Sequence, residues 1–259
     1  MKEIYLDGNR WYEIRAARYP SVNTILSATE SPEAKRRLAN WKHKQLEKFL
    51  NANRTCQNCA HFIKGGCAAG EKLRSPLTKK HRCKSFAPID AVLKAREKHM
   101  KAARSRGTAV HQHIENYFQG GDLPTSETCK YSSQITYLLK NLNEGKILIE
   151  CAVFSAVHRF AGRVDFCGEY QDQIVVADWV TTDRSYLQRD HFERKFLQCA
   201  GYSLAIAEMG LTTPTEIIVV AMSPSGAELF REPLDKWTEL WLKRVEQFWK
   251  MQNLEGVPF

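Results

Sequence analysis

The alternation of apolar and polar residues predicts a hairpin and then helices in the first half of the chain. Residues 3–14 are expected to form a hairpin around Asp7-Gly8, a favoured turn dipeptide. Ser21 is expected to cap a short helix, and Ser31-Pro32-Glu33 is typical of a helix start. That second helix should run to about Asn51, with an approximate apolar face and basic residues elsewhere. Two further helices are expected, over residues 88–105 and 107–120.

The second half of the chain alternates between helical and strand-like patterns. The expected order is a helix (131–143), a strand (147–157), a hairpin (163–182), a second helix (192–209), a second strand (216–223) and a closing helix (234–251). This order suits the α/β class, with a mixed central sheet flanked by helices. The sequence therefore predicts such a sheet, preceded by an N-terminal helical region.

The predicted hairpin at residues 163–182 carries two aspartates. If Gln171 and Asp172 form a two-residue turn, Tyr170 faces Gln173 and Asp165 faces Asp178. Opposed Cβ atoms in such a pair are about 5 Å apart, so the two carboxylates repel unless a cation or a proton lies between them. A divalent metal such as Mg²⁺, which takes oxygen ligands, would resolve the repulsion. The alternative is that one aspartate ends its strand at the surface.

Composition indicates an ordinary globular protein of 259 residues, 43% of them hydrophobic. The N-terminus has no long apolar run, so no signal peptide is visible. No stretch approaches the roughly 20 apolar residues needed to span a membrane. A soluble, cytoplasmic protein without a membrane partner is expected.

Positive charge is concentrated in one part of the chain. Residues 35–106 hold 20 Lys or Arg against 4 Asp or Glu, a surplus of +16 in a chain whose net charge is +9. The remainder is therefore acidic, at −7. A basic half on an acidic remainder points to a polyanionic partner, most commonly nucleic acid. The alternative is a solvated helix surface.

Four of the eight cysteines lie in residues 54–86, a segment with little periodicity and too few apolar residues to fold by burial. A tetrahedral zinc site would order such a segment, and its ligands would be Cys56, Cys59, Cys67 and Cys83. His61 or His81 could replace one cysteine. A 4Fe–4S cluster is the second interpretation, and free thiols are the third.

Several polar residues are set in apolar surroundings on neighbouring predicted elements. They are His111, Glu150, Asp165, Asp178, Gln198 and Tyr202. Each has an ordinary explanation by itself; His111, for example, could form a surface salt link with Glu115. Few structural proteins would bury so many polar groups without a use for them, so together they indicate a functional site.

At these residues the sequence resembles the RecB-like branch of the PD-(D/E)XK nucleases. The similarity is carried by GTAVHQHIE, IECAVFS, AGRVDF, VVADW-x-TT and LQCAGY, and by YPSVNTIL near the N-terminus. Within this branch it is most like the group that contains the mitochondrial genome maintenance exonuclease and its phage relatives. The resemblance covers nearly the whole chain except the cysteine segment, and it implies a restriction-endonuclease-like core over residues 88–259. The N-terminal hairpin and basic helices are expected at 1–53, and the cysteines indicate a Cys-rich metal-binding insert at 54–87.

The resemblance also implies roles for individual residues. His111, Asp165, Asp178 and the backbone carbonyl of Trp179 would hold Mg²⁺ or Mn²⁺. Glu150 would either assist the metal or contact its ligands from outside. Gln198 and Tyr202 match a QxxxY pattern and would position DNA or active-site groups. The implied reaction is phosphodiester hydrolysis by an exonuclease acting on single-stranded or free DNA ends.

One residue departs from the family pattern. The family has Asp-x-Lys where this chain has Asp178-Trp179-Val180, so the cation expected beside the scissile phosphate is missing. An engineered change, a natural non-catalytic DNA-binding protein, or a cation supplied by Arg163, Arg184 or Lys195 would each explain this. The preferred interpretation is a nuclease impaired at Val180, because the remaining ligand set is complete.

Two other functions remain open. One is a non-catalytic DNA-binding or adaptor module with the same fold. The other is a CRISPR-type end-processing nuclease with an iron–sulfur cluster. Trp41, Phe49 and Phe62 could stack on the bases of a single strand, although core packing is the preferred role for Trp41 and Phe49.

Overall fold

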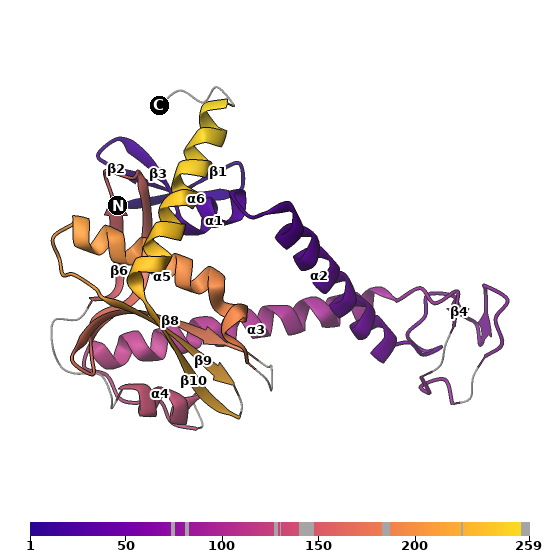
Figure 1. Ribbon diagram of the computed structural model, residues 1–259. Coiled ribbons are helices and arrows are strands. Elements are labelled where there is room, and N and C mark those ends of the chain that lie inside the picture. The colour runs from indigo at the N-terminus through magenta and orange to yellow at the C-terminus, as the bar shows by residue number, and fades with distance from the viewer. Residues whose placement is uncertain are drawn as a thin grey trace. The chain divides into compact units, whose positions relative to one another are not determined.

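The structure is a computed structural model, shown in Figure 1. It describes residues 1–73, 76–80, 83–126, 129, 131–139, 148–182, 187–223 and 225–254. The chain divides into two compact units, one made of residues 1–30 and 106–259 and the other of residues 31–105. We call them the sheet unit and the basic unit. None of the helices in the described ranges is both long enough and apolar enough to cross a membrane.

The sheet unit begins with a three-stranded antiparallel meander. Its strands are β1 (Lys2–Leu6), β2 (Asn9–Ile14) and β3 (Ala17–Pro20). The predicted turn at Asp7-Gly8 is confirmed, and both residues have the positive φ that this kind of turn requires (49° and 75°). Helix α1 (Val22–Ala28) follows and is capped as predicted, because the Ser21 hydroxyl accepts the Thr24 N–H at 3.0 Å.

A mixed sheet forms the centre of this unit, as predicted, and it has five strands. Its strands are β6 (Leu148–Ser155), β7 (Phe160–Tyr170), β8 (Gln173–Thr181), β9 (Glu216–Ser223) and β10 (Gly226–Pro233). The order is β10-β9-β8-β7-β6, and β8 and β9 are the parallel pair. Strand β10 was not predicted, because its sequence, GAELFREP, contains glycine, proline and three charged residues. At the edge of a sheet those residues are tolerated.

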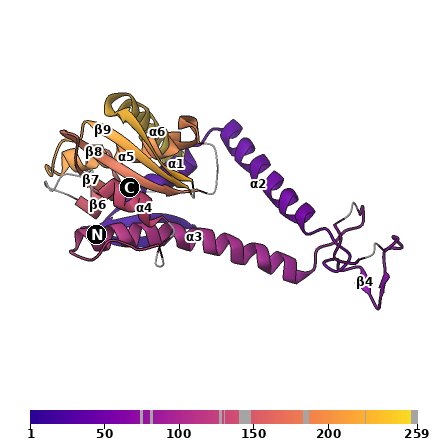
Figure 2. The ribbon, with the colours of Figure 1, turned by 90° about the horizontal axis from the view of Figure 1, so that it is seen from below.

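Helices cover both faces of this sheet (Figure 2). One hydrophobic cluster joins the sheet to α1, α5 (Glu193–Glu208) and α6 (Leu234–Leu254), with the short 3₁₀ helix η1 (Arg189–Phe192) before α5. A second cluster joins the other face to α4 (Ser132–Leu139) and to the end of α3 (Asp90–Phe118). Helices α5 and α6 approach closely at Gly201, where a Cβ atom would lie 2.8 Å from the Trp241 ring.

The continuity of α3 corrects a prediction. Two helices were expected, separated at Gly107, but a single helix runs from Asp90 to Phe118. One glycine in a helix interior costs only about 1 kcal/mol relative to alanine, and no proline accompanies it here. A Cβ atom at Gly107 would lie 3.4 Å from Thr181 Oγ1, so the small residue lets the helix approach β8 closely.

The basic unit has little buried surface. Its elements are α2 (Pro32–Ala52), the two-residue strands β4 (Phe62–Ile63) and β5 (Gly66–Cys67), and the first part of α3. Helix α2 begins after Ser31, the predicted cap. No residue of α2 is buried. The core-packing role preferred for Trp41 is therefore wrong, since its side chain is 48% exposed; Phe49 is half-buried.

Candidate active site

Three carboxylates lie on adjacent strands of the sheet. The predicted β7–β8 register is confirmed from Tyr170↔Gln173 to Phe166↔Ala177, and Asp165 and Asp178 are the next two residues in that register. On the other side of β7, Ile149 pairs with Phe166 and Cys151 with Val164, so Glu150 lies beside Asp165. The hairpin turn and the β6–β7 register thus bring Glu150, Asp165 and Asp178 to neighbouring positions on three adjacent strands.

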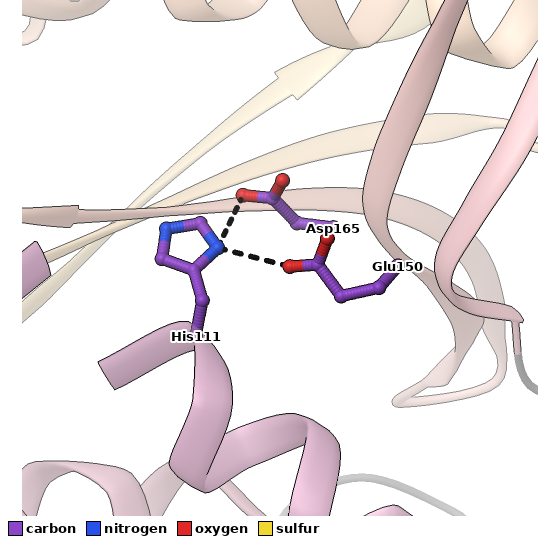
Figure 3. Close-up of side chains that lie close together, drawn as sticks. All are labelled: His111, Glu150 and Asp165. Atoms are coloured by element: carbon purple, nitrogen blue, oxygen red, sulfur yellow. Dashed lines mark hydrogen bonds and ion pairs between the residues drawn. The ribbon is translucent and has the colours of Figure 1, made fainter. Parts of the chain in front are cut away.

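His111 of α3 approaches two of these carboxylates. Its Nδ1 lies 3.1 Å from Glu150 Oε1 and 3.5 Å from Asp165 Oδ2, and Figure 3 shows both carboxylates directed toward the imidazole ring. One ligand atom from each of the three residues fits within 4.8 Å of the others. An imidazole nitrogen with two carboxylate oxygens is a donor set that suits a divalent cation.

Asp178 has a different partner. The Lys195 ammonium of α5 donates to Oδ1 at 2.9 Å and lies 2.8 Å from Oδ2. The Asp178 residue is 1% exposed, so this cation compensates a charge that would be costly to bury alone. Val180 packs against the large hydrophobic cluster on the face that α5 covers. Metal ligation by Asp178 stays a prediction.

Two other cations were considered as replacements for the missing lysine. Arg163 Nε donates to the Glu150 carbonyl oxygen at 2.8 Å and lies 2.9 Å from Glu150 Oε2. The guanidinium thus compensates the charge of Glu150, and the Arg163 side chain is 56% exposed. Arg184 lies outside the described residues. Of the described candidates, Lys195 is the one that reaches the buried aspartate.

Trp179 supports Asp165 through its backbone. The Trp179 N–H donates to Asp165 Oδ2 at 3.3 Å, and the indole packs against Phe166 with ring centroids 5.7 Å apart. These contacts hold the carboxylate in place from the neighbouring strand. Ligation of a metal by the Trp179 carbonyl stays a prediction.

Gln198 and Tyr202 lie one turn apart on α5 and bond to each other. Gln198 Nε2 donates to Tyr202 Oη at 2.8 Å, and both residues are buried. The phenol ring lies directly over Gly162 of β7, where a Cβ atom would come within 2.4 Å of it. Burial raises the pKa of Tyr202 well above its usual value, so the phenol stays protonated at neutral pH. Their predicted role in positioning DNA is untested.

Without a metal, the pKa values of Asp165, His111 and Lys195 are all raised, so these groups keep their protons to higher pH than usual. Burial, together with the charge of Asp178, raises the pKa of Asp165 to about 8. For His111, burial lowers the pKa, but the Glu150 hydrogen bond and the nearby carboxylate charges outweigh it, so the net shift is upward. Lys195 behaves in the same way, since Asp178 and Asp165 outweigh its burial and raise its pKa.

We therefore expect metal affinity to depend on pH. A cation at Asp165 must displace the proton that this carboxyl keeps below about pH 8. The affinity for Mn²⁺ should rise by about tenfold per pH unit for each displaced proton, and then level off above the pKa of the carboxyl. Calorimetric titration at several pH values, in buffers with different ionisation enthalpies, measures both the affinity and the protons released. A pH-independent affinity with no proton release would contradict the assignment of Asp165 as a ligand.

The cysteine segment lies in the basic unit. Cys56, Cys59, Cys67 and Cys83 line a common cavity of about 20 Å³. His61, considered as a replacement ligand, does not line this cavity, and His81 lies outside the described residues. The four cysteines thus share one cavity, and ligation of a metal by them stays a prediction.

Comparisons with known proteins show a distant relationship to a nuclease. The chain is 28% identical over 152 residues to mitochondrial genome maintenance exonuclease 1 of Mus musculus, a match that covers 56% of this chain and 44% of that protein. The match thus spans less than half of the length of this relative. No protein-family profile matches the chain. The crystal structure of SSO0001 aligns at 16% identity with a TM-score of 0.29, over 41% of this chain and 50% of that one, a similarity too low to support an argument.

Sequence reasoning named Lys195 as one possible cation but did not find its contact with Asp178. A local signal was present, because Lys195 precedes Gln198 by three residues and so lies one helical turn before it on the same helix. A lysine on the helix that carries the Gln198–Tyr202 pair could have been placed near the sheet on that ground alone.

Proposed function

We propose that this protein is a metal-dependent nuclease of the RecB-like PD-(D/E)XK branch, which hydrolyses phosphodiester bonds of DNA from single-stranded or free ends. The observation that supports it is the cluster of His111, Glu150 and Asp165, with the Asp178–Lys195 pair on the neighbouring strand and helix. The distant relationship to an exonuclease agrees with this chemistry.

His111, Glu150 and Asp165 would hold Mg²⁺ or Mn²⁺, and Asp178 would join them in the substrate complex. The ion would lower the pKa of the attacking water and neutralise charge on the phosphate. Asp165 would give up its proton to bind the ion, and the Trp179 N–H would keep its carboxylate oriented. The Tyr202 phenol and Gln198 amide, fixed by their mutual hydrogen bond, would orient the strand.

Lys195 would supply the cation that Val180 cannot. Its ammonium already lies within 2.9 Å of both Asp178 oxygens, on a helix packed against the sheet. A positive charge held beside the reacting phosphate stabilises the negative charge that develops there. This arrangement favours a catalytically competent enzyme over a chain impaired at Val180, which was the interpretation preferred from sequence.

The basic unit would bind the DNA backbone. Residues 31–105 contain 19 Lys or Arg against 5 Asp or Glu, and none of the α2 residues is buried. Such a surface gains affinity by releasing counterions from the phosphates. The exposed Trp41 ring is available to stack on a base.

Digestion of end-labelled single-stranded DNA tests the proposal. With Mg²⁺ or Mn²⁺ the strand should shorten progressively, whereas a chelator should stop the reaction and a circular strand of the same sequence should survive. Cleavage of circular and linear strands at equal rates would exclude a requirement for ends. Folded protein that binds DNA but cleaves neither strand with either metal would refute the nuclease proposal.

The second candidate is a non-catalytic DNA-binding module, which the valine at position 180 favours. DNA binding that is independent of metal and is retained in Asp178→Asn would support this candidate, provided that cleavage is absent in the unmodified chain. Filter binding with and without Mn²⁺ measures that directly.

A further inference from the structure

The basic unit folds with almost no apolar core. Among its described residues, those that are buried are Thr55, Cys56, Cys59 and Val92. A segment of this size normally needs a hydrophobic core, a disulfide or a metal to hold a defined structure. Two of its four buried residues are cysteines, and the structure has them as thiols. These cysteines are therefore the place at which a metal could order the segment.

The backbone brings the first three cysteines together. Cys56 and Cys59 lie in a tight turn, in which the Cys59 N–H donates to the Cys56 carbonyl at 3.2 Å. The β4–β5 hairpin follows at once, and its turn contains Lys64 and Gly65, both with positive φ (48° and 81°). Phe62 pairs with Cys67, so the hairpin returns the third cysteine to the turn that holds the first two.

The fourth cysteine arrives on a segment that pairs with the same turn. A bridge joins Cys59 to Pro88, and the Ala60 N–H donates to the Ala87 carbonyl at 2.7 Å. The Ile89 N–H donates to the Asn58 carbonyl at 3.1 Å. These bonds hold the chain after Cys83 beside the turn at Cys56–Cys59, immediately before α3 begins.

The four cysteines all line one cavity of about 20 Å³, which Phe62 and Phe86 also line. We propose that this cavity is a structural zinc site in which the thiolates of Cys56, Cys59, Cys67 and Cys83 are the four ligands. A tight chelating pair, a hairpin that supplies the third sulfur and a returning segment that supplies the fourth together provide a closed tetrahedral set. A closed set leaves no position for a reacting water, so the site is structural.

Zinc would take the place of the missing core. Binding energy at a site that does not exist in the unfolded chain becomes folding energy for the segment around it. The ion would tie the C-terminal end of α2 to the start of α3 through residues 53–89. This proposal does not depend on the proposed nuclease activity, because it concerns the fold of the basic unit alone.

Metal analysis of the full-length chain, purified without added zinc or chelator, tests the site. We expect about one zinc per chain, as for a Cys₄ structural site. Cys59→Ser and Cys83→Ser should each lose the zinc, whereas Cys129→Ala, which removes a buried thiol in the sheet unit, should retain it. Asp165→Asn should also retain it, which separates this site from the proposed active site.

A measurement on the unmodified chain removes any dependence on how the variants fold. Zinc should protect these four cysteines from alkylation, located by mass spectrometry, and Co²⁺ substitution should give the intense visible absorption of a tetrahedral thiolate complex. Stripping the metal should expose residues 53–89 to protease while the sheet unit stays intact. Iron with acid-labile sulfide in place of zinc would overturn the zinc assignment. Chain that stays metal-free after incubation with Zn²⁺ under reducing conditions, with all four thiols alkylated, would overturn the site altogether.

Discussion

Lys195→Met is expected to slow DNA cleavage by about a hundredfold or more, the usual effect of removing one group that stabilises charge in a transition state. The substitution keeps the apolar stem of the side chain but removes the ammonium that contacts both oxygens of Asp178. Binding of DNA to the basic unit should be unchanged, since Lys195 lies in the sheet unit. Single-turnover digestion at saturating protein measures the rate without contributions from product release.

A second lysine tests whether Lys195 supplies the missing cation. In the double variant Lys195→Met/Val180→Lys, cleavage should recover, because the nuclease family that the sequence resembles has its lysine at the position of Val180. Lys243→Met is the matched control, since Lys243 is exposed on α6 and pairs only with Glu239 in the described structure. If Val180→Lys alone accelerates cleavage by about a hundredfold, the natural chain lacks the cation and Lys195 does not provide it.

Asp165→Asn should have the largest effect, a loss of about a thousandfold or more in cleavage, because it removes both a ligand charge and the metal that depends on it. Mn²⁺ affinity should fall in parallel, whereas DNA affinity without metal should not. Asp172→Asn is the matched control: it makes the same chemical change in the turn of the same hairpin, at an exposed residue. Cleavage by Asp165→Asn within about tenfold of the natural chain would show that Asp165 is not a ligand.

Asp165→Asn should raise the stability of the metal-free protein, although it lowers cleavage and metal affinity. The pKa of Asp165 rises from its ordinary value of 3.8 to about 8 in the folded protein, so the protonated form is the one that folding favours. The contribution of Asp165 protonation to the free energy of unfolding is fully present below the ordinary pKa of 3.8, and it is lost as the pH rises toward 8. Without metal, Asp165→Asn should therefore melt at a higher temperature than the natural chain at pH 8, and the difference should vanish below pH 4. Thermal unfolding in chelator measures this difference.

The strongest local patterns predicted the fold correctly. The two-residue turn at Gln171 and Asp172 determined the β7–β8 register, because a short hairpin leaves little freedom in pairing. Strand β10 escaped prediction because an edge strand need not alternate apolar and polar residues. The break expected at Gly107 was wrong because packing of α3 against β8 outweighs the small helix propensity of one glycine.

The candidate site was predictable in its membership but not in its contacts. His111, Glu150, Asp165 and Asp178 could be named because each interrupts an apolar pattern. That His111 would meet Glu150 and Asp165, while Asp178 would meet Lys195, depends on how α3 and α5 pack on opposite faces of the sheet. The spacing of Lys195 and Gln198 could place the lysine near the sheet, but no local pattern names Asp178 as its partner, because the two residues lie on different elements.

The parallel pairing of β8 with β9 affects the order in which the site can assemble during folding. Strands β6, β7 and β8 are joined by short connections, so Glu150 and Asp165 can meet after little loss of chain entropy. Strand β9 can join β8 only when the long connection that contains α5 has closed. Lys195 lies in that connection, so the cation that pairs with Asp178 is carried by the same segment that must close before β9 can join β8. A chain caught before that step would already have Glu150 and Asp165 on paired strands but would lack the cation that pairs with Asp178.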